Sequence, residues 1–507
     1  MSSIEENQQI TNVHKTYDEL AKEAKDIWAE MKEKTLTQKE RCKIEMQEMP
    51  TLEPKKRASL MDEVAIGYTE EQAIIEAQRC LNCKNKPCVK GCPVGVRIPE
   101  FIEAIQRGAF KEAVDIIKTT NLLPAICGRV CPQEKQCQSV CTIGRMLKSP
   151  ERSVAIGRLE RFVADWERNN NLVTIPSVAS PTGKKVAVVG SGPAGLTVAA
   201  DTRRAGHEVT VFEALQKTGG VMVYGIPEFR LPKDIVAKEV ENLKEMGVKF
   251  ETNFLVGRTA DLATLMSEYG YDAAFIGTGA GLPKFMGIEG ENLMGVFSAN
   301  EYLTRANLMK AYDEDRADTP LYRADTVAVI GGGNVAMDAA RMGYRLKAKK
   351  VYCIYRRTRA EMPARLEEIA HAEEEGVEFC FLQNPTRIIG NEEGRVCAIE
   401  VLDYELGEPD DSGRRKPVPK PGTEHQIKVD AVIVALGNDS NPLMAQTTQG
   451  LDVTKKGNII VNEEQKTSLE GVWAGGDIVL GAATVILAMG EGRKAAAAIN
   501  EYLSSKA

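Results

Sequence analysis

Residues 184–214 have the sequence KKVAVVGSGPAGLTVAADTRRAGHEVTVFEA, and this stretch decides the expected fold. The apolar run VAVVG leads into Gly190, Gly192 and Gly195, and a helix-like run follows. In such a turn the first glycine permits the bend, the second lets backbone approach a pyrophosphate, and the third lets the helix pack closely on the strand. Glu213 ends the next apolar run, where it can accept a hydrogen bond from a ribose hydroxyl. The stretch therefore predicts a dinucleotide-binding βαβ unit, with the helix N-terminus facing the phosphates.

A second unit of the same kind begins at Asp325 and has the sequence DTVAVIGGGNVAMDAARMGYRLKAKKVYCIYRR. Its turn carries Gly331, Gly333 and Ala336. Its second strand ends in Arg356 and Arg357 rather than in an acid. Guanidinium groups suit the 2′-phosphate of NADP, which a carboxylate would repel, so NADPH is favoured over NADH. A solvated arginine pair at the end of a strand is the alternative interpretation.

The rest of the chain after the first unit alternates strand-like and helix-like runs, as in a doubly wound α/β fold. The late segments DAVIVALGNDSNP (430–442) and GVWAGGDIVLGAATVILAMGEGRKAAAAI (471–499) indicate a return to the first unit. We therefore expect two Rossmann-like domains, the second inserted in the first. Two nucleotide sites in one chain suggest hydride transfer between a nicotinamide and a bound flavin, and the cofactors supply the reactive atoms. Histidine is scarce, and His371, within EEIAHAEEEG, is expected on a helix surface.

Cysteines are concentrated before these units. Eight of the twelve are Cys80, Cys83, Cys88, Cys92, Cys127, Cys131, Cys137 and Cys141. The start MSSIEENQQI lacks a basic and apolar secretory signal, so a reducing cytoplasmic location is expected, where clustered thiolates indicate a metal site. Cys-Pro at 92–93 and 131–132 is typical of iron–sulfur ligation, although the spacings differ from the bacterial ferredoxin run. Structural zinc, and a redox dithiol at Cys80 and Cys83, are the alternatives. The isolated Cys42, Cys353, Cys380 and Cys397 are expected to be inert.

The pattern of polar and apolar residues along the chain predicts its organisation, and its composition argues against nucleic acid and membrane partners. The predicted parts are an N-terminal extension (1–60) with a helix near Tyr17 to Glu33, an all-helical iron–sulfur domain (61–177), a linker (178–183), the first part of the first nucleotide domain (184–300), the second nucleotide domain (320–437) and the second part of the first (438–507). The net charge of −7 argues against nucleic acid as a partner, and no apolar stretch is long enough to span a membrane.

Three further segments accompany the cysteines and glycine turns: YGIPEFRLPK (224–233), YRRTRAEMPA (355–364) and AGGDIVLGAATVILAMGEGRKAA (474–496). With them, the chain from about residue 50 onward resembles the glutamate synthase small-subunit family, which includes the large subunit of NADH-dependent ferredoxin:NADP oxidoreductase. It is also similar to the N-terminal part of dihydropyrimidine dehydrogenase. The resemblance implies that the first unit binds FAD and the second binds NADPH.

The resemblance also implies the residues of each site. FAD would contact Gly190, Gly192, Pro193, Ala194, Gly195, Glu213, Gly219, Gly220, Arg230, Gly476, Asp477 and Thr484. NADPH would contact Gly331, Gly333, Asn334, Val335, Ala336, Arg356, Arg357 and Glu361. Two [4Fe–4S] clusters are implied. The first would use Cys80, Cys83, Cys88 and Cys141, and the second Cys92, Cys131, Cys137 and Glu160, with Cys127 as the alternative to Glu160. From its local sequence alone, Glu160 is expected to be an exposed helical glutamate.

By the same resemblance the chain oxidises NADPH through FAD and passes electrons through the clusters to a large flavin and iron–sulfur subunit that makes glutamate. One alternative is an electron-bifurcating subunit that works with ferredoxin and a small flavin and [2Fe–2S] subunit. Another, of a different class, is a non-catalytic zinc-stabilised scaffold that binds nucleotides.

Overall fold

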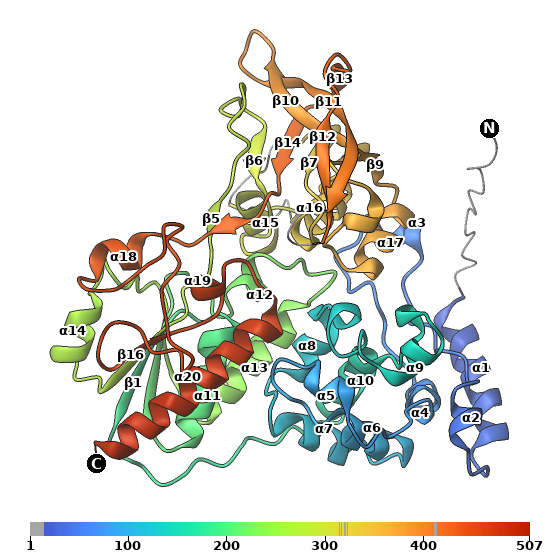
Figure 1. Cartoon of the computed structure of the whole chain (residues 1–507), viewed down its shortest axis with the longest axis vertical. Helices are drawn as coiled ribbons and strands as arrows, with labels where there is room; N and C mark the ends of the chain where they lie inside the picture. Colours follow the sequence, from blue (N-terminus) through green and yellow to red (C-terminus); the bar gives the residue numbers. More distant parts are fainter. Residues whose placement is uncertain are drawn as a thin grey trace.

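The computed structural model of the chain describes residues 15–506 apart from 314, 316, 319, 320, 322 and 410–412. A helical part and two α/β parts meet near the centre of the molecule (Figure 1). The first 14 residues of the predicted extension, and with them the segment expected to lack a secretory signal, lie outside the described residues. No helix in the described part of the chain is long and apolar enough to cross a membrane.

The N-terminal segment contains α1 (Tyr17–Met31), α2 (Gln38–Arg41) and α3 (Pro54–Arg57). A capping box formed by Thr16 and Glu19 starts α1, and Leu20 and Ala24 are its buried residues. The helix predicted near Tyr17 to Glu33 is confirmed, and it begins at Tyr17. The segment then runs to the second nucleotide domain, where the fully buried Arg57 pairs with Glu375 at 3.0 Å.

The helical domain that carries the cysteines follows. It comprises α4 (Glu70–Gln78), α5 (Pro87–Lys90), α6 (Ile98–Gln106), α7 (Phe110–Lys118), α8 (Pro124–Val130), α9 (Thr142–Met146) and α10 (Ile156–Asn169), with short 3₁₀ turns η1 (Gln133–Lys135) and η2 (Pro150–Arg152). Each longer helix has one apolar stripe, so Ile102 and Ile105 of α6 and Val114 and Ile117 of α7 become buried together. Their core is continuous with that of the first α/β domain. The all-helical fold predicted for this region is confirmed.

The first α/β domain has a five-stranded parallel sheet in the order β16-β4-β1-β2-β3. Its strands are β1 (Lys185–Val189), β2 (Glu208–Phe212), β3 (Lys249–Glu251), β4 (Ala273–Ile276) and β16 (Val472–Ala474). Its helices are α11 (Pro193–Arg204), α12 (Val221–Tyr224), α13 (Lys233–Glu245), α14 (Leu262–Ser267), α18 (Leu443–Thr447), α19 (Asp477–Leu480) and α20 (Val485–Ser505). Strand β16 comes nearly 200 residues after β4, its neighbour in the sheet. The predicted return of the chain to its first unit is therefore confirmed.

The second α/β domain has a parallel sheet in the order β6-β14-β7-β8-β9. These strands are β6 (Val296–Ser298), β7 (Thr326–Ile330), β8 (Lys350–Tyr355), β9 (Glu378–Phe381) and β14 (Ala431–Val434). An antiparallel sheet of β10 (Gln383–Gly390), β11 (Val396–Pro409), β12 (Arg415–Pro419) and β13 (His425–Lys428) projects from it (Figure 1). Strand β6, the edge strand of this sheet, lies before residue 300, within the range predicted for the first nucleotide domain.

Helices α15 (Ala299–Asn307), α16 (Asn334–Arg345) and α17 (Leu366–Glu374), with the turn η3 (Arg359–Glu361), cover the second sheet. The prediction for His371 is wrong, because this residue of α17 is buried. Burial, reinforced by the charge of Arg341, lowers its pKa to about 4. Its neighbours Glu373 and Glu374 are polar, so the local sequence gives no sign that α3 and α16 enclose this helix.

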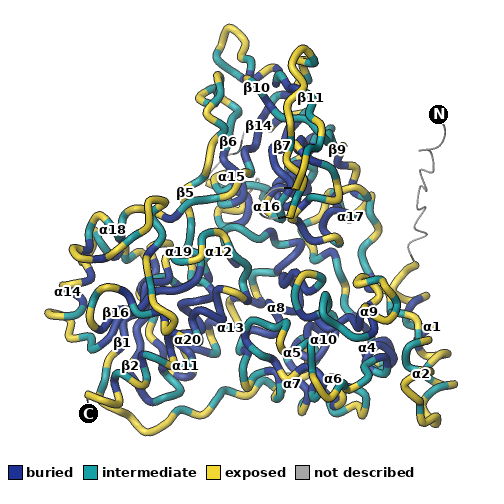
Figure 2. The backbone as a smooth tube through the Cα atoms, in the orientation of Figure 1, coloured by how far each residue is buried: buried dark blue, intermediate teal, exposed yellow. Residues whose placement is uncertain are grey.

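Two chain crossings join the α/β domains. Strands β5 (Leu282–Pro283) and β15 (Asn438–Asp439) pair antiparallel beside these crossings. Buried segments follow the two sheets and α11, α16 and α20, while the long β10–β11 projection is largely exposed at its tip (Figure 2). The two glycine turns thus lie on opposite sides of one junction.

Candidate functional site

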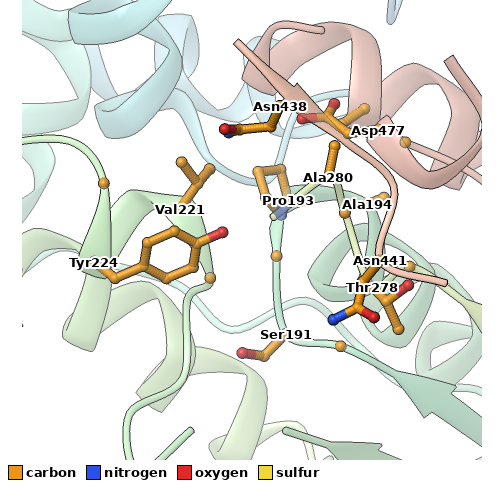
Figure 3. A pocket seen from close by; sticks show the side chains of 18 of the residues that line it. Ser191, Pro193, Ala194, Val221, Tyr224, Thr278, Ala280, Asn438, Asn441 and Asp477 are labelled. Carbon is orange, nitrogen blue, oxygen red and sulfur yellow. The ribbon is translucent and has the colours of Figure 1, made fainter. Parts of the chain in front are cut away.

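A cavity of about 350 Å³ opens between the two glycine turns, and its lining comes from both α/β domains. Ser191, Pro193 and Ala194 of the first turn face it, as do Tyr224 of α12 and Asp477 of α19 (Figure 3). Asn334 and Val335 of the second turn lie at the same cavity. The structure therefore brings the predicted flavin and nicotinamide segments together.

The first glycine turn fits a dinucleotide on steric grounds. Gly190 has φ +99°, and a Cβ there would lie 2.6 Å from the carbonyl oxygen of Gly277. A Cβ on Gly195 would lie 2.0 Å from the carbonyl oxygen of Gly190, so only glycine lets α11 start this close to β1. A Cβ on Gly192, in contrast, would meet nothing within 4 Å, because this residue faces the open cavity. This is the space that a pyrophosphate at a helix N-terminus needs.

Glu213 follows β2 and joins the parts of this turn. One carboxylate oxygen accepts hydrogen bonds from the amide of Ser191 at 3.0 Å and its hydroxyl at 2.5 Å. The hydroxyl of Ser191 in turn accepts a hydrogen bond from the amide of Gly219 at 2.9 Å. Gly220, with φ +56°, approaches Gly192 so closely that a Cβ would lie 2.8 Å from its Cα. Glu213 thereby holds the turn and the Gly219–Gly220 segment in one arrangement.

Asp477 and Thr484 lie on the other side of the cavity, at the starts of two helices. Asp477 is the first residue of α19, after Gly476, and it accepts a hydrogen bond from the amide of Ala483 at 3.2 Å. Burial raises its pKa to about 6. Thr484 is the N-cap of α20, so the positive end of that helix dipole faces the cavity and can stabilise negative charge there.

Arg230 lines the cavity edge, but its guanidinium already has partners. It lies 2.6 Å from Asp338 of α16 and 3.1 Å from Glu368 of α17. All three side chains are nearly inaccessible. Arg230 therefore joins the two α/β domains, and its contact with FAD stays a prediction.

The two arginines at the end of β8 differ. Arg356 is exposed, whereas Arg357 is buried and donates a hydrogen bond from Nε to the carbonyl oxygen of Arg415 at 2.7 Å. Glu361 accepts hydrogen bonds from the amide and hydroxyl of Thr358 and so caps η3. Of the two predicted arginines, Arg356 is therefore the one whose side chain is open to solvent.

The second glycine turn repeats the steric pattern of the first. Gly331 has φ +141°, and a Cβ there would lie 2.4 Å from the carbonyl oxygen of Ala435. Ala336 is fully buried under the start of α16. Asn334 accepts a hydrogen bond from the amide of Arg365 at 2.8 Å, which ties the turn to the loop after η3.

The predicted ligands of the first cluster line one small cavity: Cys80, Cys83, Cys88 and Cys141. The Cys83 thiol lies 3.1 Å from the hydroxyl of Thr142, so two segments far apart in the sequence meet there. Burial raises the pKa of Cys80 to about 11 and that of Cys88 to about 12, so a bound cation would be needed to keep these thiolates at neutral pH. Among the described residues, no group of three or more Cys, His, Asp or Glu side chains is arranged to hold a single metal ion.

The predicted ligands of the second cluster line a separate cavity: Cys92, Cys131, Cys137 and Glu160. Cys127 is not among its lining residues; its thiol lies 3.5 Å from the sulfur of Met489 in α20. Expecting Glu160 to be exposed is wrong, since only 8% of it is accessible and burial raises its pKa to about 8. Asn121 donates a hydrogen bond to its carboxylate at 2.7 Å. Helix α10, which carries Glu160, packs on α8, and the sequence pattern of one helix does not show which other helix covers it.

Sequence reasoning missed Gln136, which links two of these cavities. It lines the Cys92, Cys131, Cys137 and Glu160 cavity, and its amide nitrogen lies 3.4 Å from the hydroxyl of Thr484 at the flavin cavity. Nearby, α20 passes so close that a Cβ on Gly490 would lie 3.1 Å from the carbonyl oxygen of Pro93. Only its place within CPQEKQC, between two expected ligands, could have pointed to Gln136.

Comparisons with known proteins agree with this arrangement. Residues 57–172 match the family described as dihydropyrimidine dehydrogenase domain II, 4Fe–4S cluster, and residues 184–499 match the pyridine nucleotide-disulphide oxidoreductase family. The glutamate synthase [NADPH] small chain of Halomonas elongata is 38% identical over 88% of this chain and 94% of its own length.

Two other matches show less about this chain, because one covers only part of the relative and the other has low identity. The NADP(+)-dependent formate dehydrogenase subunit beta of Moorella thermoacetica is 41% identical over 82% of this chain, and this chain spans 60% of that subunit's length. The structure of Mycobacterium tuberculosis FprA in complex with NADPH aligns with a TM-score of 0.53 over 64% of this chain and 85% of FprA. At 20% identity, this last match shows the shared fold alone.

Three observations point to the same family: the cavity between the two glycine turns, the helical domain that carries the cysteines, and the matches over most of both sequences. The chain belongs to the glutamate synthase small-subunit family and is an NADPH-dependent flavin and iron–sulfur oxidoreductase.

Proposed function

We propose that this chain is an electron-input subunit that carries two [4Fe–4S] clusters and serves a glutamate synthase large subunit. The observation that carries the proposal is the contact between cavities: Thr484 of the flavin cavity lies 3.4 Å from Gln136 of the second cysteine cavity. When bound, NADPH and FAD would supply two-electron hydride chemistry, and the clusters one-electron transfer.

The chain's own residues would bind and orient these groups. Gly192 and the start of α11 would receive the FAD pyrophosphate, and Glu213 would hold the turn in shape. The N-terminus of α20, capped by Thr484, would stabilise negative charge at the flavin. Arg356 would bind the 2′-phosphate of NADPH, because it is exposed and carries a fixed charge.

The cysteine cavities support two clusters with separate ligands. Cys80, Cys83, Cys88 and Cys141 would hold one, and Cys92, Cys131, Cys137 and Glu160 the other. Glu160 rather than Cys127 is favoured as the eighth ligand because Glu160 is among the residues that line the cavity with Cys92, Cys131 and Cys137, and Cys127 is not. Asn121 would then orient the Glu160 carboxylate through its hydrogen bond.

Anaerobic titration of the purified chain with NADPH tests this function. Iron, sulfide, zinc and flavin are quantified on the same sample, and flavin and iron–sulfur absorbance are followed. We expect FAD with about eight irons, reduced by NADPH much faster than by NADH. Zinc without iron would instead support the scaffold, and a flavin that NADPH does not reduce would contradict the proposed role.

The partner needs its own measurement. Mixed with a glutamate synthase large subunit, the chain should support formation of glutamate from glutamine and 2-oxoglutarate with NADPH. A stable complex without glutamate formation would redirect the search to another acceptor, such as the ferredoxin of the bifurcating alternative.

A further inference from the structure

A short loop of the second α/β domain contacts both the second glycine turn and the segment that carries the cysteines of the second cavity. This loop, residues 362–367, runs from the end of η3 into α17. The amide of Ala364 donates to the carbonyl oxygen of Gly332 at 3.2 Å, and the amide of Arg365 donates to Asn334 Oδ1 at 2.8 Å. Both acceptors belong to the glycine turn, so a change in the position of that turn is passed to the loop.

The side chain of Arg365 makes the contact with the cysteine segment. Only 7% of this residue is accessible. Its Nη1 donates to the carbonyl oxygen of Arg129 at 2.6 Å, and its Nη2 donates to Gln133 Oε1 at 3.2 Å. These two acceptors lie on either side of Cys131 in the sequence. Two charge-assisted hydrogen bonds from one planar guanidinium fix its position as well as its orientation.

Gln133 extends this contact to the second cysteine cavity, which it lines. Its amide nitrogen donates to the carbonyl oxygen of Cys127 at 3.3 Å. The side chain also packs against α10, because a Cβ on Gly157 would lie 2.1 Å from this amide nitrogen, three residues before Glu160. A continuous series of hydrogen bonds therefore leads from the glycine turn through Arg365 and Gln133 to the wall of the cavity.

Other contacts between the loop and the cysteine segment are more exposed. Lys135 Nζ donates to the carbonyl oxygen of Pro363 at 2.6 Å, and the amide of Leu366 donates to Glu134 at 3.3 Å, both at the surface. Water competes for exposed hydrogen bonds, so the buried contacts of Arg365 fix the loop more firmly than these do.

The charge of Arg365 also acts on the cysteine between its two acceptors. The Cys127 thiol and burial raise the pKa of Cys131 well above its ordinary value, and the positive charge of Arg365 opposes this shift. The guanidinium lies 3.0 Å from Glu367 of α17, and its Nε lies 3.9 Å from Glu134, so these carboxylates help to hold it in place. A cation held beside Cys131 favours the reduced form of a cluster bound there, because reduction adds one negative charge.

We propose that Arg365 is a positioning residue that couples nucleotide binding at the second glycine turn to the reduction of the second cluster. This rests on the proposed function, because it assumes that NADPH binds at that turn and that Cys131 ligates a cluster. An occupied turn would hold the 362–367 loop in place and keep the guanidinium beside the cysteine segment. The coupling is reciprocal, so the reduced chain would bind the nucleotide more tightly by the same factor.

Hydrogen–deuterium exchange of the holoenzyme tests the contact without any turnover. The probe is 2′-phospho-ADP-ribose, which carries the phosphates of NADPH but no nicotinamide and therefore cannot accept a hydride. We expect the probe to slow exchange at the amides of residues 131–137 several-fold in the unaltered chain. Unchanged exchange of this segment with the probe bound would overturn the proposal, whatever the variants do.

Two substitutions separate the contacts of Arg365 from its bulk. Arg365→Met removes the charge and both hydrogen bonds to the cysteine segment but keeps the backbone amide that bonds Asn334. Arg365→Lys keeps the charge and can donate to one of the two acceptors. The matched control is Arg387→Met, which removes an exposed arginine of β10 that pairs with Glu400. Iron and flavin are quantified in every variant.

The midpoint potential of the second cluster gives a readout that packing alone would not move. It is followed by electron paramagnetic resonance during redox titration, with and without the probe, on the signal that is missing from Cys131→Ser. We expect the probe to bind about tenfold more tightly to the reduced chain, which corresponds to a rise of about 59 mV for one electron. Arg365→Met should lose most of this shift, Arg365→Lys should keep part of it, and the control should keep all of it.

Equal potentials with and without the probe in the unaltered chain would overturn the proposal. A shift as large in Arg365→Met as in the unaltered chain would overturn it as well, and so would equal losses in the methionine and lysine variants, which indicate a role in packing alone. A chain that contains no iron, or that does not bind the probe, contradicts the proposed function instead, so the two failures are distinguishable.

Discussion

Arg356 and Arg357 are adjacent in the sequence, but only one of them is available to a ligand. Successive residues at a strand end point to opposite sides, so Arg356 is exposed while Arg357 is buried against Arg415. The sequence pattern could not separate the two, because it depends on which side of the loop β12 covers.

Replacing Arg356 by alanine should therefore reduce selectivity for NADPH. A charge-assisted hydrogen bond to phosphate is worth roughly 1.5 to 3 kcal/mol, so kcat/KM for NADPH should fall about 10- to 100-fold, with little change for NADH. Stopped-flow flavin reduction with both nucleotides measures this. Arg387→Ala, an exposed arginine paired with Glu400 on β11, is the control and should keep the NADPH preference. An equal loss for both nucleotides would contradict the assignment.

Gln136 is the second residue whose role comes from the tertiary structure. Gln136→Leu keeps its size but removes the amide that faces Thr484. We expect the rate constant for cluster reduction to fall several-fold relative to that for flavin reduction, followed at separate wavelengths after mixing with NADPH. Gln449→Leu, an exposed glutamine near α18, serves as the control. An unchanged ratio in Gln136→Leu would show that electron transfer from the flavin to the clusters does not depend on this contact.

His371 makes stability depend on pH. Arg57, Arg341, Glu367 and Glu368 surround it, and burial lowers its pKa from 6.5 to about 4. The unfolded chain then binds a proton that the folded chain does not, so folding loses stability as the pH falls from about 6.5 to about 4, by about 1.4 kcal/mol per pH unit. Chemical denaturation of His371→Gln should show a smaller decline across this window. The same slope in both proteins would contradict the assignment to His371.

At the scale of elements, buried ion pairs join the two α/β domains beside an apolar contact, in which Phe229 of the first domain packs into the core of the second. Arg230, just before α13, pairs with Asp338 of α16 and Glu368 of α17. Arg341 of α16 pairs with Glu375, which also receives Arg57 of α3. Each ion is buried beside its partner, so removing one side leaves an uncompensated charge.

Asp338→Asn should therefore destabilise the protein by about 3 kcal/mol or more. Chemical denaturation of the holoenzyme measures this. Glu301→Gln on α15 breaks an exposed pair with Arg305, 2.7 Å apart, and should cost only about 0.5 kcal/mol. Similar effects of the two substitutions would show that the Arg230–Asp338 pair does not hold the domains together.

At the scale of the whole molecule, the helical domain and the first α/β domain share one apolar core. Phe101 and Ile126 of the former belong to the same buried group as Val198 and Met489 of the latter. Events at the cysteines should therefore reach the flavin domain, because metal binding is coupled to folding.

Cys131→Ser should lower both the iron content and the melting temperature of the flavin-containing part. Iron analysis and calorimetry of the same samples measure these changes. Cys397→Ser, at an exposed cysteine on β11, is the matched control and should change neither quantity. A Cys131→Ser protein that loses iron but melts as before would contradict the coupling.

The sequence by itself determined the fold class, the two dinucleotide-type glycine turns and the helical domain that carries the cysteines. These features depend on local patterns: glycines that tolerate φ +99° at Gly190 or a close helix at Gly195, alternating apolar runs, and clustered thiols. The return of β16 to the first sheet followed from the same patterns.

Only the tertiary structure decided which side chains are enclosed and which cavities touch. Glu160 and His371 have the local sequence of exposed helical residues, but α8, α3 and α16 cover them. Gln136 meets Thr484 across nearly 350 residues of sequence, and Arg230 meets Asp338 across 108. Helical periodicity identifies which face of a helix is apolar, but polar residues are enclosed when a second element packs over them, and that packing depends on distant parts of the chain.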